Sequence, residues 1–428
     1  MQTTLLEQET ALTKEGQAEQ APTIIDKTTR SITLSFLVGC VTLIMTGFAI
    51  IMPVFPQRLH ALGLGAETLA LMEGAFGLGM FLFSTPMGTL AGRLGRKPIL
   101  LLSLGGYIIT NLLLVVVNTP LLFVLIRFVE GMVISGLMPA SMAMVGDTIV
   151  PEKQGRWIGW LTTAQATGIA LGPALGGILS QMLGLTAPFV LSAAIALVAS
   201  LLALLFVPET LPAQRRTAAI SRTVKRETSR SHNRPTSLGG LIWLFAPFLL
   251  IDFGLIFTYP FVFPQYPFFF EKVLHSTAAQ YGLILSVFGL ALAIGPLVLG
   301  TLSERWPNKL LIMVGSLLFG ALNVVMFLAP LYPLLIVGAA LAGLGCALAG
   351  PALGGIYLGA TTDANRGQVM GLRGSAISAA VMLGPLTQAL VGHWITPQMT
   401  FAIGVALSLA MVLVAFLLLR LPPQKEAV

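Results

Sequence analysis

The stretch GTLAGRLGRKPIL, Gly88 to Leu100, places a basic segment with three glycines between two long apolar runs. A glycine-rich segment that ends in lysine suggests a phosphate-binding loop, which requires Ser or Thr after the lysine, a strand before the loop and a helix after it. Here Pro98 follows Lys97, and neither flanking run reads as a strand. The sequence argues against a phosphate loop, so the role of the segment depends on the apolar runs around it.

The composition indicates that those runs lie in lipid. Of the 428 residues, 56% are hydrophobic and only 10% are charged, against roughly 25% charged in a typical soluble domain. The net charge of +7 does not indicate a nucleic-acid partner, because the basic residues occupy short segments between apolar stretches. Cys40 and Cys346 both lie inside apolar runs, so no disulfide framework is expected. No metal-binding or cofactor-binding pattern is present, and no cofactor is expected.

Apolar stretches long enough to cross a bilayer, about 20 residues each, recur along the chain. They lie near residues 32–55, 68–88, 98–117, 121–146, 157–180, 187–207, 240–263, 279–300, 310–329, 334–359, 369–392 and 399–420. We therefore expect an all-α integral membrane protein with twelve transmembrane helices in two six-helix halves, 31–207 and 239–420.

The basic residues predict the orientation of these spans. Apart from Arg58, Arg127, Lys272 and Arg373, the 24 Lys and Arg residues fall on segments that one topology places on the same side of the membrane. Basic loops remain in the cytoplasm. We therefore expect both termini there, with a disordered tail over 1–30, a basic linker over 208–238 and a short tail over 421–428.

The two halves resemble each other at a nearly constant spacing, 212 positions for the glycine and proline pairs and 208 for a repeated tetrapeptide. Gly88 and Gly300, Pro139 and Pro351, and Gly172-Pro173 and Gly384-Pro385 are each separated by 212 positions, and the tetrapeptide VFPQ occurs at residues 54–57 and 262–265. Parallel repeats of this kind rock against each other around a site near the membrane midplane. The repeat therefore predicts a transporter that works by alternating access.

Four motifs resemble the major facilitator superfamily. Gly88-x-Leu-Ala-x-Arg93-x-Gly95-Arg96-Lys97 resembles its loop between spans two and three, and Arg127-x-x-Glu130-Gly resembles a fourth-span signature with Glu in place of Gln. Gly168-x-x-x-Gly172-Pro173-x-x-Gly176-Gly177 is similar to the pattern of its antiporters. Gly47-x5-Pro53-Val-x-Pro56 is similar to a first-span pattern of twelve-span drug:proton antiporters. The resemblance implies the superfamily fold, with a cavity lined by spans one, four, seven and ten.

The same resemblance implies a gating role for the loop, although its basic residues could equally be ordinary cytoplasmic anchors. The family usually carries an acid where this chain has Gly92, and the second-half copy carries Glu304 and Arg305 instead of a Gly-Arg pair. A latch would therefore involve Glu304 or Asp147, near the end of span four. We expect Arg373, about one turn into span eleven, to reach the interface as a gate or anchor residue.

The glycines of span five are spaced for close helix packing. Gly168, Gly172 and Gly176 recur every four residues and share one helix face, and Pro173 is expected to bend the helix. Generic small-residue packing, common in any helical membrane protein, is the alternative to an antiporter-specific role.

Ionisable residues inside spans need a reason, because each costs roughly 2.5–3.5 kcal/mol at the bilayer centre. Arg127 and Glu130 are three residues apart and can pair on one face of span four. That pair is either a static structural bridge or a proton-exchange site in which Arg127 adjusts the proton affinity of Glu130. Glu73 could take part, or could simply reach the interface.

Asp252 lies near the middle of span seven, on one helix face with Phe245, Phe248 and Tyr259. A carboxylate within an aromatic stripe suits a lipophilic, often cationic, substrate or a protonation site. The alternative is packing of the aromatic residues against lipid beside a structural acid.

These observations favour a secondary transporter that exports lipophilic, drug-like molecules in exchange for protons. It would reside as a monomer in the inner membrane, an expectation taken from the resemblance. An importer or facilitator of a specific polar metabolite is the first alternative. An intramembrane enzyme or a membrane sensor is remote, because the sequence has no Gly-x-Ser-x-Gly elbow and no His-Glu-x-x-His pair.

Overall fold

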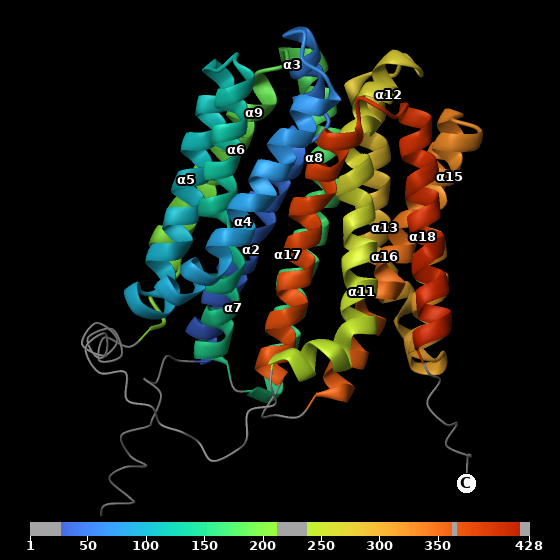
Figure 1. Ribbon diagram of the computed structural model, residues 1–428. Helices are drawn as coiled ribbons and strands as arrows, with labels where there is room; N and C mark the ends of the chain where they lie inside the picture. The colour runs from blue at the N-terminus through green and yellow to red at the C-terminus, as the bar shows by residue number, and fades with distance from the viewer. Residues whose placement is uncertain (1–26, 150, 212–237, 362–365, 420–428) are drawn as a thin grey trace, which may run out of the picture.

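The computed structural model describes residues 27–149, 151–211, 238–361 and 366–419, and every regular element within them is helical (Figure 1). Most of the predicted tail over 1–30, the predicted tail over 421–428 and most of the predicted linker over 208–238 lie outside the described residues, and helix α2 already begins at Lys27. In the described part of the chain, twelve stretches are long and apolar enough to cross a membrane. They match the twelve predicted spans and confirm the expected fold class.

The helices fall into two sets. The first half comprises α2 (Lys27–Ile51), α3 (Phe55–Ala61), α4 (Ala66–Leu94), α5 (Arg96–Val116), α6 (Pro120–Ile134), α7 (Leu137–Thr148), α8 (Pro151–Leu183) and α9 (Ala187–Phe206). The second half comprises α11 (Leu238–Val262), the 3₁₀ turn η2 (Phe263–Gln265), α12 (Tyr266–Lys272), α13 (Ala278–Arg305), α14 (Asn308–Phe319), α15 (Ala321–Leu328), α16 (Tyr332–Ala360), α17 (Arg366–Val391) and α18 (Pro397–Leu418).

The repeated VFPQ tetrapeptide breaks a span at the same place in both halves. In the first copy Pro56 lies in the first turn of α3, and in the second copy Pro264 lies in the first turn of η2. Proline has no N–H to donate, so it fits the first turn of a new helix but not the interior of a continuing one. The first span consequently extends to Ala61 as two helices, six residues beyond its predicted end.

The basic segment Gly88–Leu100 is not the extended turn that the sequence predicts. Helix α4 continues to Leu94 and α5 begins at Arg96, so Gly95 alone lies outside both helices. Gly95 has φ +122°, and a Cβ there would collide with the Glu209 carboxylate. Three glycines in the segment suggest a long turn, but a helix tolerates glycine in its interior, and Gly88 and Gly92 lie inside α4. Only Gly95, with its positive φ, requires a glycine.

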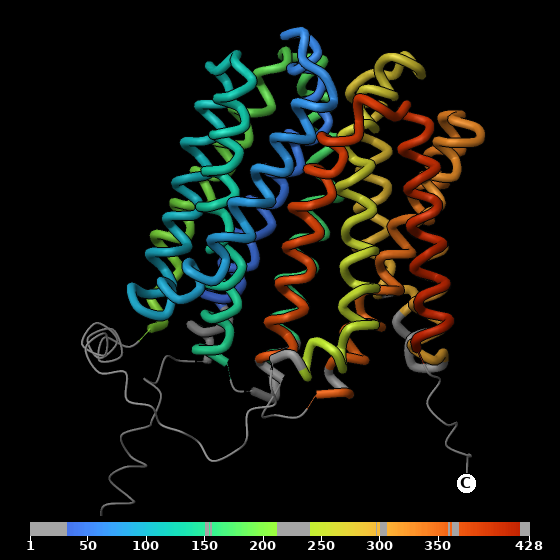
Figure 2. The backbone as a smooth tube through the Cα atoms, viewed as in Figure 1, coloured from blue at the N-terminus to red at the C-terminus, as the bar shows by residue number. Residues whose placement is uncertain are grey.

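The two halves contact each other along two helix pairs. Helix α8 packs on α13, and α4 packs on α17. Figure 2 shows α4 (blue) beside α17 (red) in the middle of the molecule. A Cβ on Gly77 would lie 2.8 Å from Met382 Cα of α17, and one on Gly177 would lie 2.7 Å from Ala279 Cα of α13. The imidazole of His60 on α3 also contacts Glu271 on α12, at 2.8 Å. In Figure 1, α3 and α12 lie at the end of the bundle opposite the C-terminus, so the halves are joined at that end.

Candidate functional site

The first cluster of charged side chains lies between α4 and α6. The Arg127 guanidinium donates to Glu130 Oε2 at 3.1 Å, as helical spacing predicts, and also to Glu73 Oε1 at 2.6 Å. The Glu130 side chain is fully buried, Arg127 is 5% exposed and Glu73 is 21% exposed. One arginine therefore serves two carboxylates, which leaves the cluster with one negative charge in excess when both are ionised.

Aromatic rings enclose this cluster. The guanidinium carbon of Arg127 lies 4.5 Å from the ring centroid of Phe76 and 5.8 Å from the centroids of Phe48 and Phe55. Cation–π contacts of this kind stabilise a desolvated arginine. The cavity beside Arg127 and Glu73 has a volume of about 20 Å³, enough for a water molecule and not for a substrate. The cluster is therefore nearly dry in this arrangement of the halves.

The second cluster lies between α11 and α17. Arg373 donates from Nε to Asp252 Oδ2 at 2.9 Å and from Nη2 to Asp252 Oδ1 at 3.3 Å. Asp252 is 5% exposed and Arg373 is 22% exposed. The sequence predicts that the Arg373 side chain reaches the membrane interface. The structure instead places it inward, against the Asp252 carboxylate of span seven. Neither partner is an isolated charge.

The aromatic residues expected around Asp252 divide into two groups. Phe245 and Phe248 pack on Tyr357 of α16, with ring centroids 5.9 Å apart in both pairs. The guanidinium carbon of Arg373 lies 5.1 Å from the Tyr357 ring centroid, so this group borders the Asp252–Arg373 pair. Tyr259 instead stacks on Phe288 of α13, with centroids 5.9 Å apart.

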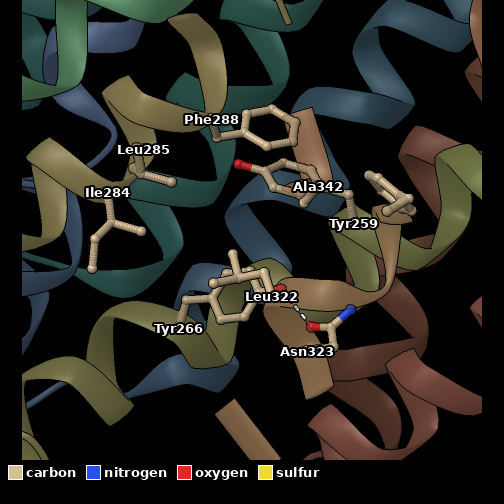
Figure 3. Close-up of a pocket in the computed structure, with 9 residues that line it drawn as sticks. Tyr259, Tyr266, Ile284, Leu285, Phe288, Leu322, Asn323 and Ala342 are labelled. Atoms are coloured by element: carbon tan, nitrogen blue, oxygen red, sulfur yellow. Dashed lines mark hydrogen bonds between the residues drawn. The ribbon is translucent and has the colours of Figure 1, made fainter. Parts of the chain in front are cut away.

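Figure 3 shows the cavity beside Tyr259, inside the second half. Its walls are mostly apolar, and the Tyr266 hydroxyl donates to Asn323 Oδ1 on one side. The cavity volume is about 10 Å³, the space of about one water molecule. This pocket therefore cannot hold a drug-sized molecule in this arrangement of the helices.

The loop motif is held by two carboxylates of its own half. Arg96 Nε donates to Asp147 Oδ2 at 3.1 Å, and the backbone N–H groups of Arg96 and Lys97 donate to the two Glu209 oxygens at 3.0 and 3.2 Å. Glu209 thereby caps the start of α5. Arg93 is exposed, and Gly88 lies near Pro139 of α7, at ordinary van der Waals distance.

Glu304 and Arg305, which belong to the predicted gate, lie on α13. The structure places the helix of Glu304 and Arg305 but does not describe their side chains. The alternative latch partner, Asp147, contacts the loop through Arg96.

The glycine motif of span five contacts both neighbouring helices. A Cβ on Gly168, Gly172 or Gly176 would collide with α2, at Met45, Ala49 and the Ile50 carbonyl respectively. Gly177 faces the other way and abuts Ala278 and Ala279 of α13. Pro173 lies inside α8, and its carbonyl contacts Gly282. The motif therefore lets one helix pack closely within its own half and against the other half.

Sequence reasoning missed two contributors to these sites, although each carries a signal. Phe76 is one helical turn from Glu73 and therefore on the same face, which makes it a neighbour of any partner of that acid. Glu209 is the first acid after the sixth span, and only the packing of α9 beside α5 brings it to the loop.

Comparisons with known proteins agree with this architecture. The Major Facilitator Superfamily matches residues 37–273 and 253–428. The chain is 34% identical over 187 residues to the multidrug resistance protein MdtG of Enterobacter lignolyticus (strain SCF1), an alignment that covers 42% of this chain and less than half, 44%, of that protein. It is 29% identical over 362 residues to the class H tetracycline resistance protein of Pasteurella multocida, covering 81% and 85% of the two chains.

Among solved structures, the chain superimposes on a bacterial homologue of the human lysosomal transporter Spinster, in an inward-facing and unoccupied conformation. The TM-score is 0.70 at 16% identity, with 91% of this chain and 95% of the other covered. At that identity the similarity concerns the fold alone.

Proposed function

The chain belongs to the major facilitator superfamily, which makes it a membrane transporter, and on that premise we propose that it exports lipophilic small molecules in exchange for protons. The names of two relatives, a multidrug resistance protein and a tetracycline resistance protein, support the substrate class and the direction.

The observation that carries the proton part of the proposal is the sharing of Arg127. Glu73 and Glu130 compete for one guanidinium, and Glu130 Oε1 is buried with no hydrogen-bond partner among the described residues. An ionised carboxylate with an unpaired buried oxygen is costly. Protonation of Glu130 removes the excess charge while Glu73 remains paired with Arg127. Glu130 is therefore the proton carrier in this proposal.

Asp252 is the substrate side of the proposal. It lies beside Phe245, Phe248 and Tyr357, and its charge is neutralised by Arg373. A lipophilic cation can take the place of Arg373 at the carboxylate and lie against the aromatic rings, which favour a desolvated cation. Arg373 then competes with the substrate for Asp252 and helps to release it.

In this proposal, the two halves rock against each other and open the site alternately to each side of the membrane. We place the termini in the cytoplasm, since the basic segments favour that side, so the joined end with α3 and α12 faces outward. A ligand shifts the equilibrium between two conformations only if it binds one of them better. In this proposal the proton at Glu130 and the substrate at Asp252 are two ligands that each bind one conformation better than the other. We further propose that the protein resides in the bacterial inner membrane and works as a monomer.

Transport into inverted membrane vesicles with an acidic interior tests this function. A fluorescent lipophilic cation is the probe, with Glu130→Gln and Asp252→Asn beside the unchanged chain and a protonophore to dissipate the gradient. We expect gradient-dependent accumulation that each substitution abolishes. Accumulation that survives the protonophore would overturn proton coupling. Transport by both variants at the rate of the unchanged chain would overturn the site assignment.

A further inference from the structure

A larger cavity lies between the two halves, at the end of the bundle where α3 and α12 lie. Its volume is about 350 Å³, within the range of small-molecule sites. One wall is the turn between α3 and α4, residues 63–68. The other wall comes from the second half and consists of Gln265, Gln388, Gly392 and His393. The cavity is distinct from the groups around Arg127 and Asp252.

The first wall contains the uncapped start of a long helix. Helix α4 has 29 residues, and its N-cap is Gly65, whose extended backbone carries no side chain to accept from the first turn. The N–H groups of Ala66, Glu67 and Thr68 have no acceptor within the helix, because the first turn of any helix lacks one. These N–H groups and the helix dipole favour an anionic group in the cavity.

The opposite wall supplies a buried amide without a partner. Gln388 is 1% exposed, and neither its Oε1 nor its Nε2 has a hydrogen-bond partner in the described part of the chain. A Cβ on Gly392 would lie 3.0 Å from Gln388 Nε2 and 3.7 Å from Gln265 Nε2. Both amides therefore lie beside Gly392, at the cavity wall. A buried amide without a partner is costly, and a ligand oxygen that accepts from Nε2 removes part of that cost.

We propose that this cavity binds a small organic monocarboxylate, with its carboxylate between the first turn of α4 and the amide of Gln388. Glu67 also lines the cavity, and its negative charge opposes divalent anions such as sulfate. A single negative charge on a planar group matches two opposed sets of N–H donors. The remaining volume accommodates an organic substituent.

Occupation of the site acts on the arrangement of the halves. Because one wall belongs to each half, a bound carboxylate favours the conformation in which α4 and α17 are joined at this end. The site therefore gives small carboxylates on that side of the membrane a means to slow the transport cycle.

Binding of benzoate to the purified full chain in nanodiscs tests the proposal, with benzamide as the neutral isostere. Calorimetry measures the affinity. Two variants differ only at the cap. Gly65→Asp supplies a carboxylate to the first turn of α4 from within the chain, and Gly65→Ala does not; a Cβ at this position meets nothing within 4 Å.

We expect saturable benzoate binding, at least tenfold weaker binding of benzamide, loss of binding in Gly65→Asp and retention in Gly65→Ala. The thermal unfolding temperature of Gly65→Asp should equal or exceed that of the unchanged chain, since a capping side chain stabilises a helix. Gln388→Leu should weaken benzoate several-fold. Absence of saturable binding, equal binding of benzamide, or unchanged binding in Gly65→Asp would each overturn the proposal, the last by placing benzoate elsewhere, for example at Arg127 or Arg373.

Discussion

Arg373 on α17 forms a two-point hydrogen-bonded ion pair with Asp252 on α11, at 2.9 and 3.3 Å and 121 positions apart in sequence. The pair fixes the rotation of both helices, because a small turn of either one would separate the two side chains. It also means that a substrate at Asp252 must compete with a group of the protein. In the proposed function, the affinity for that substrate therefore depends on Arg373 as well as on the Asp252 carboxylate.

Breaking this pair on one side should destabilise the protein. Arg373→Met leaves Asp252 buried without a counter-charge, and the loss of one partner of a buried pair costs about 3 kcal/mol or more. The double variant Asp252→Leu/Arg373→Met removes both charges and should recover much of that loss. Thermal unfolding of the two purified variants, beside the unchanged chain, checks this expectation. A single variant as stable as the unchanged chain would show that the pair carries little energy.

Substrate binding should depend on pH through Glu130. Deprotonation restores the excess negative charge of the Arg127 cluster, so the affinity for a lipophilic cation should rise as the pH rises. Glu130→Gln mimics the protonated form at all pH values, and its affinity should be low and flat across the titration. Fluorescence titration of the cation at several pH values, in detergent and without a gradient, measures both curves. A pH-dependent affinity in Glu130→Gln would assign the proton to another group.

Close packing of α8 on α2 should not tolerate a methyl group at Gly176. A Cβ there collides with the Ile50 carbonyl, a backbone atom that cannot rotate away. Overpacking typically costs about 1–3 kcal/mol, so Gly176→Ala should lower the unfolding temperature by several degrees and reduce transport.

Gly159→Ala is the matched control on the same helix, since its Cβ meets nothing within 4 Å. It should behave like the unchanged chain. Equal effects of the two substitutions would indicate that helix propensity, rather than the contact with α2, decides the outcome.

The cap on α5 predicts an effect of Glu209 on the loop. Glu209→Ala removes the acceptor of three backbone N–H groups, those of Arg96, Lys97 and Leu211, and should cost about 1 kcal/mol, as the loss of a helix cap does. Gly95→Ala should cost more, because the residue has φ +122° and a Cβ collides with the Glu209 carboxylate. The double variant Gly95→Ala/Glu209→Ala relieves the collision and should be less destabilised than the sum of the two. Thermal unfolding measures the coupling, and strict additivity would argue against the contact.

Much of this architecture could be predicted because it depends on local properties of the chain. Span positions follow from stretches of apolar residues, and the Arg127–Glu130 pair follows from three-residue spacing on one helix. The boundary at Gly95 could not be predicted, since Gly88 and Gly92 are equally permissive in sequence and only the backbone conformation distinguishes them.

The sequence by itself determined the positions of the twelve spans, the repeat between the two halves and the residues that carry charge into the spans. Tertiary structure alone decided the partners of those charges: Glu73 for Arg127, Arg373 for Asp252, and Glu209 for the start of α5. The physical reason is that hydropathy and helical periodicity specify which face of a helix is polar. Which other helix that face meets depends on how the helices tilt, rotate and pack. In this protein the glycines of α4 permit close packing on α6 and α17, and those of α8 permit close packing on α2 and α13.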